Sequence, residues 1–192
     1  MTAPRLLAFA GSTRTGSFNQ RLLDLAAAAA RDAGAEVTQI RLRDFDLPLY
    51  DADLEASAFP PAADELRALF VAHDGFLIAS PEYNGGVSAV LKNALDWASR
   101  PRPGEPMTAL AAYRGKVAAI MSASISPFGG LRGLAHLRQI LGTVQTIVAT
   151  EQVAVPFADK AFDGAELVEP LPKALIPIMA ARTVFLAKAL RA

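Results

Sequence analysis

The chain has 192 residues, a length that fits one domain with a substantial core. It contains no cysteine, which excludes disulfides, zinc–thiolate sites, iron–sulfur clusters and a thiol nucleophile, so redox chemistry would have to come from a bound cofactor. The 19 basic and 19 acidic residues cancel, so no global field attracts nucleic acid or an anionic membrane. Hydrophobic residues make up 52%, yet no apolar run approaches the roughly 20 residues of a membrane span. We expect a cytoplasmic protein whose apolar surplus lies in its core or at a subunit interface.

Apolar runs alternate with helical patterns along the chain. The runs predict five strands, at residues 6–10, 36–41, 75–79, 116–121 and 146–155, the last open to an interruption. The helical patterns predict five helices, at residues 19–33, 64–72, 88–98, 131–141 and 171–191. Pro172 falls near the start of the last helix and Pro177 inside its first turns. Prolines at positions 48, 60 and 61 predict an irregular connection over residues 44–61.

Strands that are apolar throughout and alternate with helices predict a parallel sheet covered on both faces. The expected fold is therefore an α/β three-layer sandwich with a five-stranded parallel sheet, formed as a single domain over residues 1–192. In such sheets, ligands bind beyond the carboxyl ends of the strands at a topological switch point. The loops after the first, third and fourth strands are the places to search for a site.

The loop after the first strand, residues 11–19, has the composition of a phosphate site. Four hydroxyl side chains accompany the guanidinium of Arg14, and the amides of the following helix start provide further donors. The loop lacks the Gly-Lys-Ser/Thr of a Walker sequence and the Gly-x-Gly-x-x-Gly of a dinucleotide fold. The alternative interpretation is that Ser17 or Asn19 only caps the helix and that Arg14 is a solvated loop charge.

The loop after the third strand, residues 80–87, suits a flat heterocycle. Pro81 stiffens the backbone, Gly85 and Gly86 permit close approach, and the amide of Asn84 can both donate and accept. A ring edge with alternating carbonyl and N–H groups would match this loop. The alternative interpretation is a simple turn, because Asn-Gly and Gly-Gly are strong turn signals.

Three segments together resemble the NADPH-dependent FMN reductase family, whose members have the flavodoxin-like fold and include flavin, quinone, chromate and azo reductases. The segments are GSTRTGSFN, PEYNGGVSAVLKNALDW and SASISPFGGLRGLAHLRQIL, which span roughly residues 6–142 in the required order. The Pro-Glu-Tyr-Asn sequence followed by Leu-Lys-Asn-x-x-Asp-Trp is highly specific. The resemblance implies a flavodoxin-like fold and bound FMN.

The resemblance also implies which residues contact the FMN. The phosphate would be held by Ser12, Arg14, Ser17 and Asn19, with backbone amides near Phe18. The isoalloxazine would be lined by Pro81, Glu82, Tyr83, Asn84 and Gly85, and approached by Ser122 or Ser124 together with Gly129.

The implied activity is transfer of a hydride from NADPH or NADH, through FMN, to a small acceptor such as a quinone, a free flavin, chromate or an azo compound. The flavin carries the hydride, so no protein group is nominated as catalytic. Donor and acceptor would use one open flavin face in turn, in a ping-pong cycle, and the assembly would be a homodimer or a dimer of dimers. Two alternatives are a flavodoxin-type electron carrier, disfavoured by the zero net charge, and a scaffold that binds no flavin.

Several further residues carry open interpretations. Tyr83 either stacks on the flavin or belongs to an interface, and Glu82 either accepts from a partner subunit or is a solvated carboxylate. Arg100 and Arg102 either bind nicotinamide nucleotide phosphates or are solvated loop charges. Trp97 belongs to the core or an interface.

The remaining expectations concern surface and packing. The two histidines, His73 and His136, are surface or packing residues, and two isolated histidines make no metal site. The family's second loop, here residues 47–51, commonly reaches a partner's site. Phe128 departs from the usual family composition and could reshape the acceptor pocket, while Arg132 and Arg138 would serve the dimer or the site rim.

Overall fold

The computed structural model describes residues 2–106 and 108–191. Five strands form one parallel sheet in the order β2-β1-β3-β6-β7. This order is that of flavodoxin-like folds, so the predicted fold and its five strands are confirmed. The strands are β1 (Arg5–Ala10), β2 (Glu36–Arg41), β3 (Gly75–Ala79), β6 (Val117–Ala123) and β7 (Ile147–Val155).

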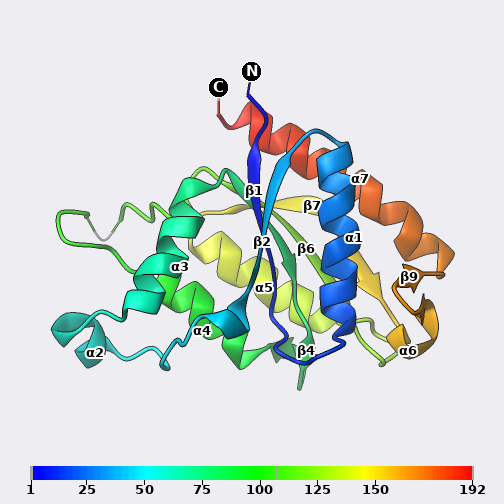
Figure 1. Ribbon diagram of the computed structural model, residues 1–192, viewed down its shortest axis with the longest axis horizontal. Helices are drawn as coiled ribbons and strands as arrows, with labels where there is room; N and C mark the ends of the chain where they lie inside the picture. The colour runs from blue at the N-terminus through cyan, green and yellow to red at the C-terminus, as the bar shows by residue number, and fades with distance from the viewer. Residues whose placement is uncertain (1, 107, 192) are drawn as a thin grey trace.

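Helices cover both faces of the sheet, as Figure 1 shows. Helices α1 (Phe18–Asp32) and α7 (Pro170–Ala189) lie on one face, and α3 (Pro61–Ala72), α4 (Ala89–Ala98) and α5 (Leu131–Thr143) lie on the other. Successive residues of β1 point to opposite faces of the sheet. Leu6 and Ala8 therefore belong to the core between the sheet and helices α1 and α7, and Leu7 and Phe9 belong to the core on the other face. Strands β3 and β6 are buried at every residue, which explains why Ser122 is the one polar residue in their sequences.

Short elements in the connections were not predicted. Helix α2 (Ala52–Ser57) lies in the stretch expected to be irregular, and the carboxylate of Asp51 caps it by accepting from the amides of Asp53 and Leu54. A few local hydrogen bonds are enough to form a helix or hairpin too short for hydrophobic periodicity to reveal. The other short elements are η1 (Leu42–Asp44), β4 (Glu82–Tyr83), β5 (Gly86–Val87), α6 (Ala158–Ala161), β8 (Phe162–Asp163) and β9 (Glu166–Leu167).

Strand β7 is continuous, and the irregularity expected in it takes the form of a shift in its pairing with β6. The register of β7 against β6 shifts between Ala118 and Ile120, where several β7 residues face one residue of β6. Arg138 of α5 donates to the carbonyl oxygens of Val148 and Ala149 in this irregular stretch, at 3.2 and 3.0 Å. Arg138 therefore stabilises the irregular part of β7 within its own chain, and its expected role at a dimer interface or the site rim stays a prediction.

Helix α7 matches the helix predicted at residues 171–191 to within two residues at each end, and it is strongly apolar. By length and composition alone it could cross a membrane, and 39% of its most apolar window is buried inside the protein. Its buried residues Met179, Ala180 and Val184 belong to the core beneath α1 and the sheet, so packing accounts for part of its apolar character. Pro177 lies within the helix, as predicted.

Candidate functional site

The loops after β1, β3 and β6 meet at one edge of the sheet and form a cleft of about 350 Å³. This is the lower edge in Figure 1, where β4 is labelled. The chain runs from β1 outward to β2 and then returns to β3 on the other side of β1, so the cleft lies at the switch point of the sheet. Its lining residues are Ser12, Arg14, Ser17, Phe18, Asn19, Pro81, Glu82, Tyr83, Ala123, Ser124 and Ile125. All of them except Ala123 and Ile125 were predicted from the sequence.

The start of α1 lines one end of the cleft. Ser17 occupies the N-cap position, but its hydroxyl makes no capping hydrogen bond, and the first turn of α1 contains no acidic residue. The interpretation of Ser17 as a simple helix cap is therefore wrong. The first amide N–H groups of α1 keep their capacity to bind an anion.

Arg14 places a positive charge at the same end. Its guanidinium lies 5.5 Å from the centroid of the Phe18 ring. Among the described residues it forms no ion pair. An uncapped helix start beside an uncompensated guanidinium fits the phosphate group predicted for this loop.

Asn19 has a structural task that the sequence did not reveal. Its amide nitrogen donates to the carbonyl oxygen of Ala123 at 2.8 Å, and its amide oxygen accepts from the N–H of Ala123 at 3.0 Å. The side chain is buried, and these two bonds join the start of α1 to the end of β6. Asn19 thus holds two walls of the cleft together, while its direct contact with a flavin stays a prediction.

Ser88 joins the loop after β1 to the segment that follows the β3 loop. Its hydroxyl donates to the carbonyl oxygen of Gly11 at 2.6 Å and accepts from the amide of Leu91 at 3.3 Å, which caps α4. A Cβ atom at Gly11 would lie 2.9 Å from the Cβ of Leu91, so this close approach requires glycine. The Ser88 of the middle motif therefore serves the packing of the site.

The predicted flavin loop contains a β-hairpin. Strands β4 and β5 pair in an antiparallel manner, and Asn84 and Gly85 form the turn with φ values of 52° and 79°. Two consecutive positive φ angles explain the Asn-Gly sequence, so the turn interpretation is confirmed for these residues. Pro81, Glu82 and Tyr83 line the cleft, whereas Asn84 and Gly85 do not. The role of the latter two at a flavin stays a prediction.

Glu82 is buried, so its interpretation as a solvated carboxylate is wrong. Its side chain is 4% exposed and accepts from the amide of Gly133 at 2.9 Å and from Nε of Arg132 at 2.8 Å. Burial alone would raise the pKa of Glu82, but these hydrogen bonds outweigh it and hold the pKa below its usual value. Glu82 is therefore ionised near neutral pH and links the hairpin to the start of α5.

Comparison with known proteins gives the family. The sequence matches the model of the NADPH-dependent FMN reductase family over residues 4–160. An NAD(P)H-dependent FMN reductase of Pseudomonas aeruginosa is 39% identical over 162 residues, which are 83% of this chain and 82% of that protein. The chain belongs to the NADPH-dependent FMN reductase family.

A further curated relative and a solved structure are also similar to this chain. A quinone reductase of Escherichia coli strain K12 is 39% identical over 142 residues, which are 72% of this chain and 69% of that protein. The solved structure of FerB, an NAD(P)H:(acceptor) oxidoreductase from Paracoccus denitrificans, superposes with a TM-score of 0.79. It covers 97% of this chain and 98% of its own length at 24% identity, which supports the fold alone.

The third FMN reductase motif contributes one wall of the cleft. Ser124 lines the cleft, whereas Ser122 is fully buried. The hydroxyl of Ser122 packs against Gly130 so closely that a Cβ atom at position 130 would lie 1.9 Å from the hydroxyl oxygen. Gly129 packs on the backbone of Val155 and the following residue, with φ of +58°. Of the two serines proposed from the sequence, the geometry favours Ser124. Flavin contacts by Ser122 and Gly129 stay predictions.

The second half of the middle FMN reductase motif holds the segment 47–51. The side-chain nitrogens of Asn93 and Trp97 both donate to the carbonyl oxygen of Pro48, at 2.9 and 2.8 Å, and Asn93 also accepts from the amide of Tyr50. Trp97 is fully buried, as expected for a core residue. Leu49, at the tip of this fixed segment, is 79% exposed.

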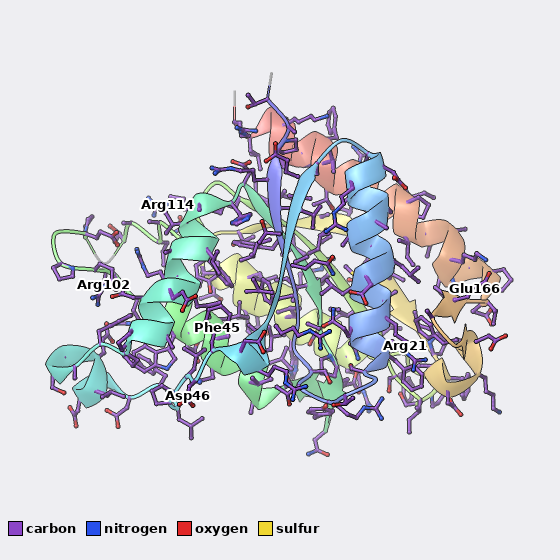
Figure 2. The ribbon with its side chains drawn as sticks, viewed as in Figure 1. Arg21, Phe45, Asp46, Arg102, Arg114 and Glu166 are labelled. Atoms are coloured by element: carbon purple, nitrogen blue, oxygen red, sulfur yellow. The ribbon has the colours of Figure 1, made fainter. Side chains whose placement is uncertain are left out.

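The arginines after α4 are not solvated loop charges. Arg100 pairs with Glu55 and Arg102 pairs with Asp64, each at 2.8 Å, and all four side chains are at least partly shielded. Their charges are therefore paired within the chain, and their role in binding nicotinamide nucleotide phosphates stays a prediction. Figure 2 shows Arg102 on the α3 side of the molecule, well away from Arg21 at the start of α1.

Sequence reasoning missed part of the surroundings of the phosphate loop. Arg21, Arg41 and Arg43 line a second hollow beside Arg14. Nothing in their sequence spacing marks them as a group, because β2 reaches this place only through its pairing with β1. The signal that would have found them is the flavodoxin-like strand order, which puts the end of β2 next to the first loop.

Proposed function

We propose that this protein is an FMN-dependent NAD(P)H oxidoreductase that reduces a small acceptor such as a quinone, a free flavin, chromate or an azo compound. The observation that carries the proposal is the cleft at the switch point, which has an uncapped helix start at one end and a hairpin wall at the other. Its volume is within the range of small-molecule sites. When bound, FMN supplies the redox chemistry, taking a hydride from NAD(P)H and passing the electrons to the acceptor.

The phosphate of FMN would be held where α1 begins. Ser12 and Ser17 would donate through their hydroxyl groups, and Arg14 would add a charge-assisted hydrogen bond. The absence of a carboxylate from the first turn of α1 supports this placement, since an acidic side chain there would compete with the phosphate. Phe18 would hold Arg14 in place through its ring.

The flavin ring would lie between the first hairpin strand and the loop after β6. Pro81, Glu82 and Tyr83 line one side of the cleft in this region, and Ser124 lines the other. Tyr83 is 56% exposed, so its ring is free to cover a flat ligand from the solvent side. Asn19 would fix the end of β6, and Ser88 the segment after the hairpin, relative to the loop after β1, which keeps the ring in the fixed geometry that hydride transfer requires.

The chain's own acid–base groups would serve orientation. Glu82 lines the cleft, but it is ionised near neutral pH and its oxygens already accept from Arg132 and Gly133. A carboxylate in that state has no proton to donate. We therefore assign Glu82 to holding the hairpin against α5.

We further propose that donor and acceptor occupy the same cleft in turn, and that the protein acts in the cytoplasm as a homodimer or a dimer of dimers. The alternation is supported by the cleft, which residues from all three loops line together. The assembly is supported by large apolar side chains that stay exposed, among them Leu49, Ile125, Leu171, Ile178 and Phe185.

The test is an absorbance titration of the purified protein reconstituted with FMN. We expect anaerobic NADPH or NADH to bleach the bound flavin by two electrons, and a benzoquinone to restore the colour. Initial rates at varied donor and acceptor concentrations should give parallel double-reciprocal lines. Failure to bind FMN would refute the proposal, and binding without bleaching by either nicotinamide would favour a one-electron carrier.

A further inference from the structure

A second hollow, of about 190 Å³, lies next to the cleft. Ser12, Arg14 and Ser17 line both spaces, so the cleft and the hollow share a wall. The hollow is otherwise lined by Thr13, Gly16, Gln20, Arg21, Arg41 and Arg43. No carboxylate belongs to its lining.

Strand pairing explains how four arginines meet here. Arg14 lies in the loop after β1 and Arg21 in the second turn of α1. Arg41 is the last residue of β2 and pairs in register with Ala10, the last residue of β1. The end of β2 and the following η1, which carries Arg43, are thereby placed beside the phosphate loop. Figure 1 shows both at the lower edge of the sheet.

The positive charges of this hollow are not neutralised within the described chain. None of the ion pairs formed by residues 2–106 and 108–191 includes one of its four arginines. Asp44 and Asp46 follow closely in sequence, but neither reaches ion-pair distance of Arg41 or Arg43. In a chain with 19 basic and 19 acidic residues, this is a local excess of charge.

The four arginines differ in how many contacts their guanidinium groups already make within the chain. Arg21 donates to the carbonyl oxygen of Gly164 at 2.6 Å and lies 5.3 Å from the centroid of the Phe18 ring. Arg14 lies 5.5 Å from the centroid of the same ring and also lines the cleft. The guanidinium groups of Arg41 and Arg43 make no hydrogen bond to any described residue. Arg41 and Arg43 are therefore free to bind a ligand.

We propose that this hollow is a second phosphate site, which binds a phosphoryl group of a nucleotide other than the phosphate of FMN, with Arg41 and Arg43 as its main ligands. Guanidinium groups bind phosphate through two parallel hydrogen bonds, and several of them together suit a doubly charged group. The inference rests on the proposed placement of FMN, whose phosphate would occupy the wall that the two spaces share.

Two nucleotides carry such a group within reach of the cleft. One is NADPH, whose 2′-phosphate distinguishes it from NADH. The other is FAD, whose second phosphate follows directly on the phosphate that FMN also has. In either case the hollow determines specificity, for NADPH over NADH or for a dinucleotide flavin over FMN.

The experiment compares the wild type with the double variant Arg41→Ala/Arg43→Ala. A matched control, Arg31→Ala/Arg114→Ala, removes two exposed arginines outside the hollow. Arg31 lies in the last turn of α1, and Arg114 lies before β6 at the opposite edge of the sheet, where Figure 2 labels it. The FMN-loaded proteins are titrated with 2′,5′-ADP by calorimetry, and the apoproteins are titrated with FAD and with FMN by flavin fluorescence.

We expect the double variant to bind 2′,5′-ADP or FAD at least about tenfold more weakly than the wild type and the control, because two charged hydrogen-bond donors are lost. Its affinity for FMN should change by less than about twofold. A loss confined to 2′,5′-ADP would assign the site to the 2′-phosphate of NADPH, and a loss confined to FAD would assign it to the second phosphate of FAD. A loss for both would show that the site accepts either source.

Two results would overturn the inference. If the affinity for FMN falls as much as the others, the hollow holds the phosphate of FMN itself. If no titration distinguishes the double variant from the control, the hollow binds no nucleotide phosphate. A wild type that does not bind FMN would instead refute the proposed function, and the placement on which this site rests would fail with it.

Discussion

Arg14 and Ser17 lie at the point where the proposed phosphate of FMN would meet the chain. Arg14→Ala should weaken FMN binding roughly 10- to 100-fold, because a charge-assisted hydrogen bond contributes about 1.5–3 kcal/mol. Ser17→Ala should weaken it by about threefold to tenfold, since its hydroxyl is a neutral donor that makes no capping bond. Fluorescence titration of the apoprotein measures both effects.

The phosphate-free flavin, riboflavin, provides the decisive comparison. Its affinity should be nearly the same in the wild type and in both variants, because it lacks the group that Arg14 and Ser17 would hold. Arg31→Ala, at the other end of α1, is the control for removal of a positive charge. An equal loss for riboflavin and FMN would place these residues elsewhere than at the phosphate.

The lowered pKa of Glu82 predicts that the free energy of unfolding depends on pH. The pKa of Glu82 is lowered in the folded protein. Its ionised side chain therefore adds to the free energy of unfolding in full above the pKa of an unfolded glutamate, and this stabilisation is lost as the pH falls through the pKa of the folded protein. Glu82→Gln keeps an acceptor for Gly133 but loses the charge opposite Arg132. We expect it to cost about 1–2 kcal/mol near neutral pH, or about 2–8 °C in Tm, and this difference should shrink below about pH 4.

Urea unfolding of the apoproteins near pH 7 and well below pH 4 measures this difference. Glu166→Gln is the matched control, because Glu166 pairs with Lys173 on the surface, where ion pairs contribute little. It should unfold like the wild type at both pH values. A Glu82→Gln protein as stable as the wild type near pH 7, or a difference that grows in acid, would contradict the assigned role.

At the scale of elements, hydrophobic periodicity was sufficient for the sheet and its five long helices. Residues 75–79 and 117–121 are apolar because β3 and β6 are covered on both faces, and this directly predicts central parallel strands. Periodicity could not reveal α2 or the β4–β5 hairpin, since each is formed by a few local hydrogen bonds. The Asn84–Gly85 turn was readable from its residues, although a flavin contact was also expected there.

The site residues were predictable where a motif lies within one loop. They were missed where the contact joins residues that are far apart in the sequence. All eleven cleft residues come from segments that the motifs mark, and nine of them were predicted individually. The bond between Asn19 and Ala123 joins residues 104 positions apart, so only the fold reveals that Asn19 is a tie between walls. The same holds for Arg41, which reaches the phosphate loop through the pairing of β2 with β1.

At the scale of the whole molecule, the exposed apolar side chains gather in separate places. Leu171, Ile178 and Phe185 follow one another at intervals of seven residues along α7, so they lie on the same face of that helix. Leu49 and Ile125 lie instead on the segment 47–51 and in the loop after β6. Separate apolar surfaces of this kind suit a dimer that pairs again into a dimer of dimers.

Sedimentation equilibrium tests this arrangement. We expect the wild type to sediment as a dimer or a tetramer, and Ile178→Glu/Phe185→Glu to lose one level of assembly, because a buried apolar contact would be replaced by two like charges. Both positions are more than half exposed in the single chain, so the substitutions should leave its Tm unchanged. Val71→Glu, at an exposed apolar position on α3, is the control. A wild type that is only monomeric at working concentration would contradict the proposed assembly. A double variant that assembles like the wild type would exclude this face of α7 from the interface, because two charges there could not be buried without loss of assembly.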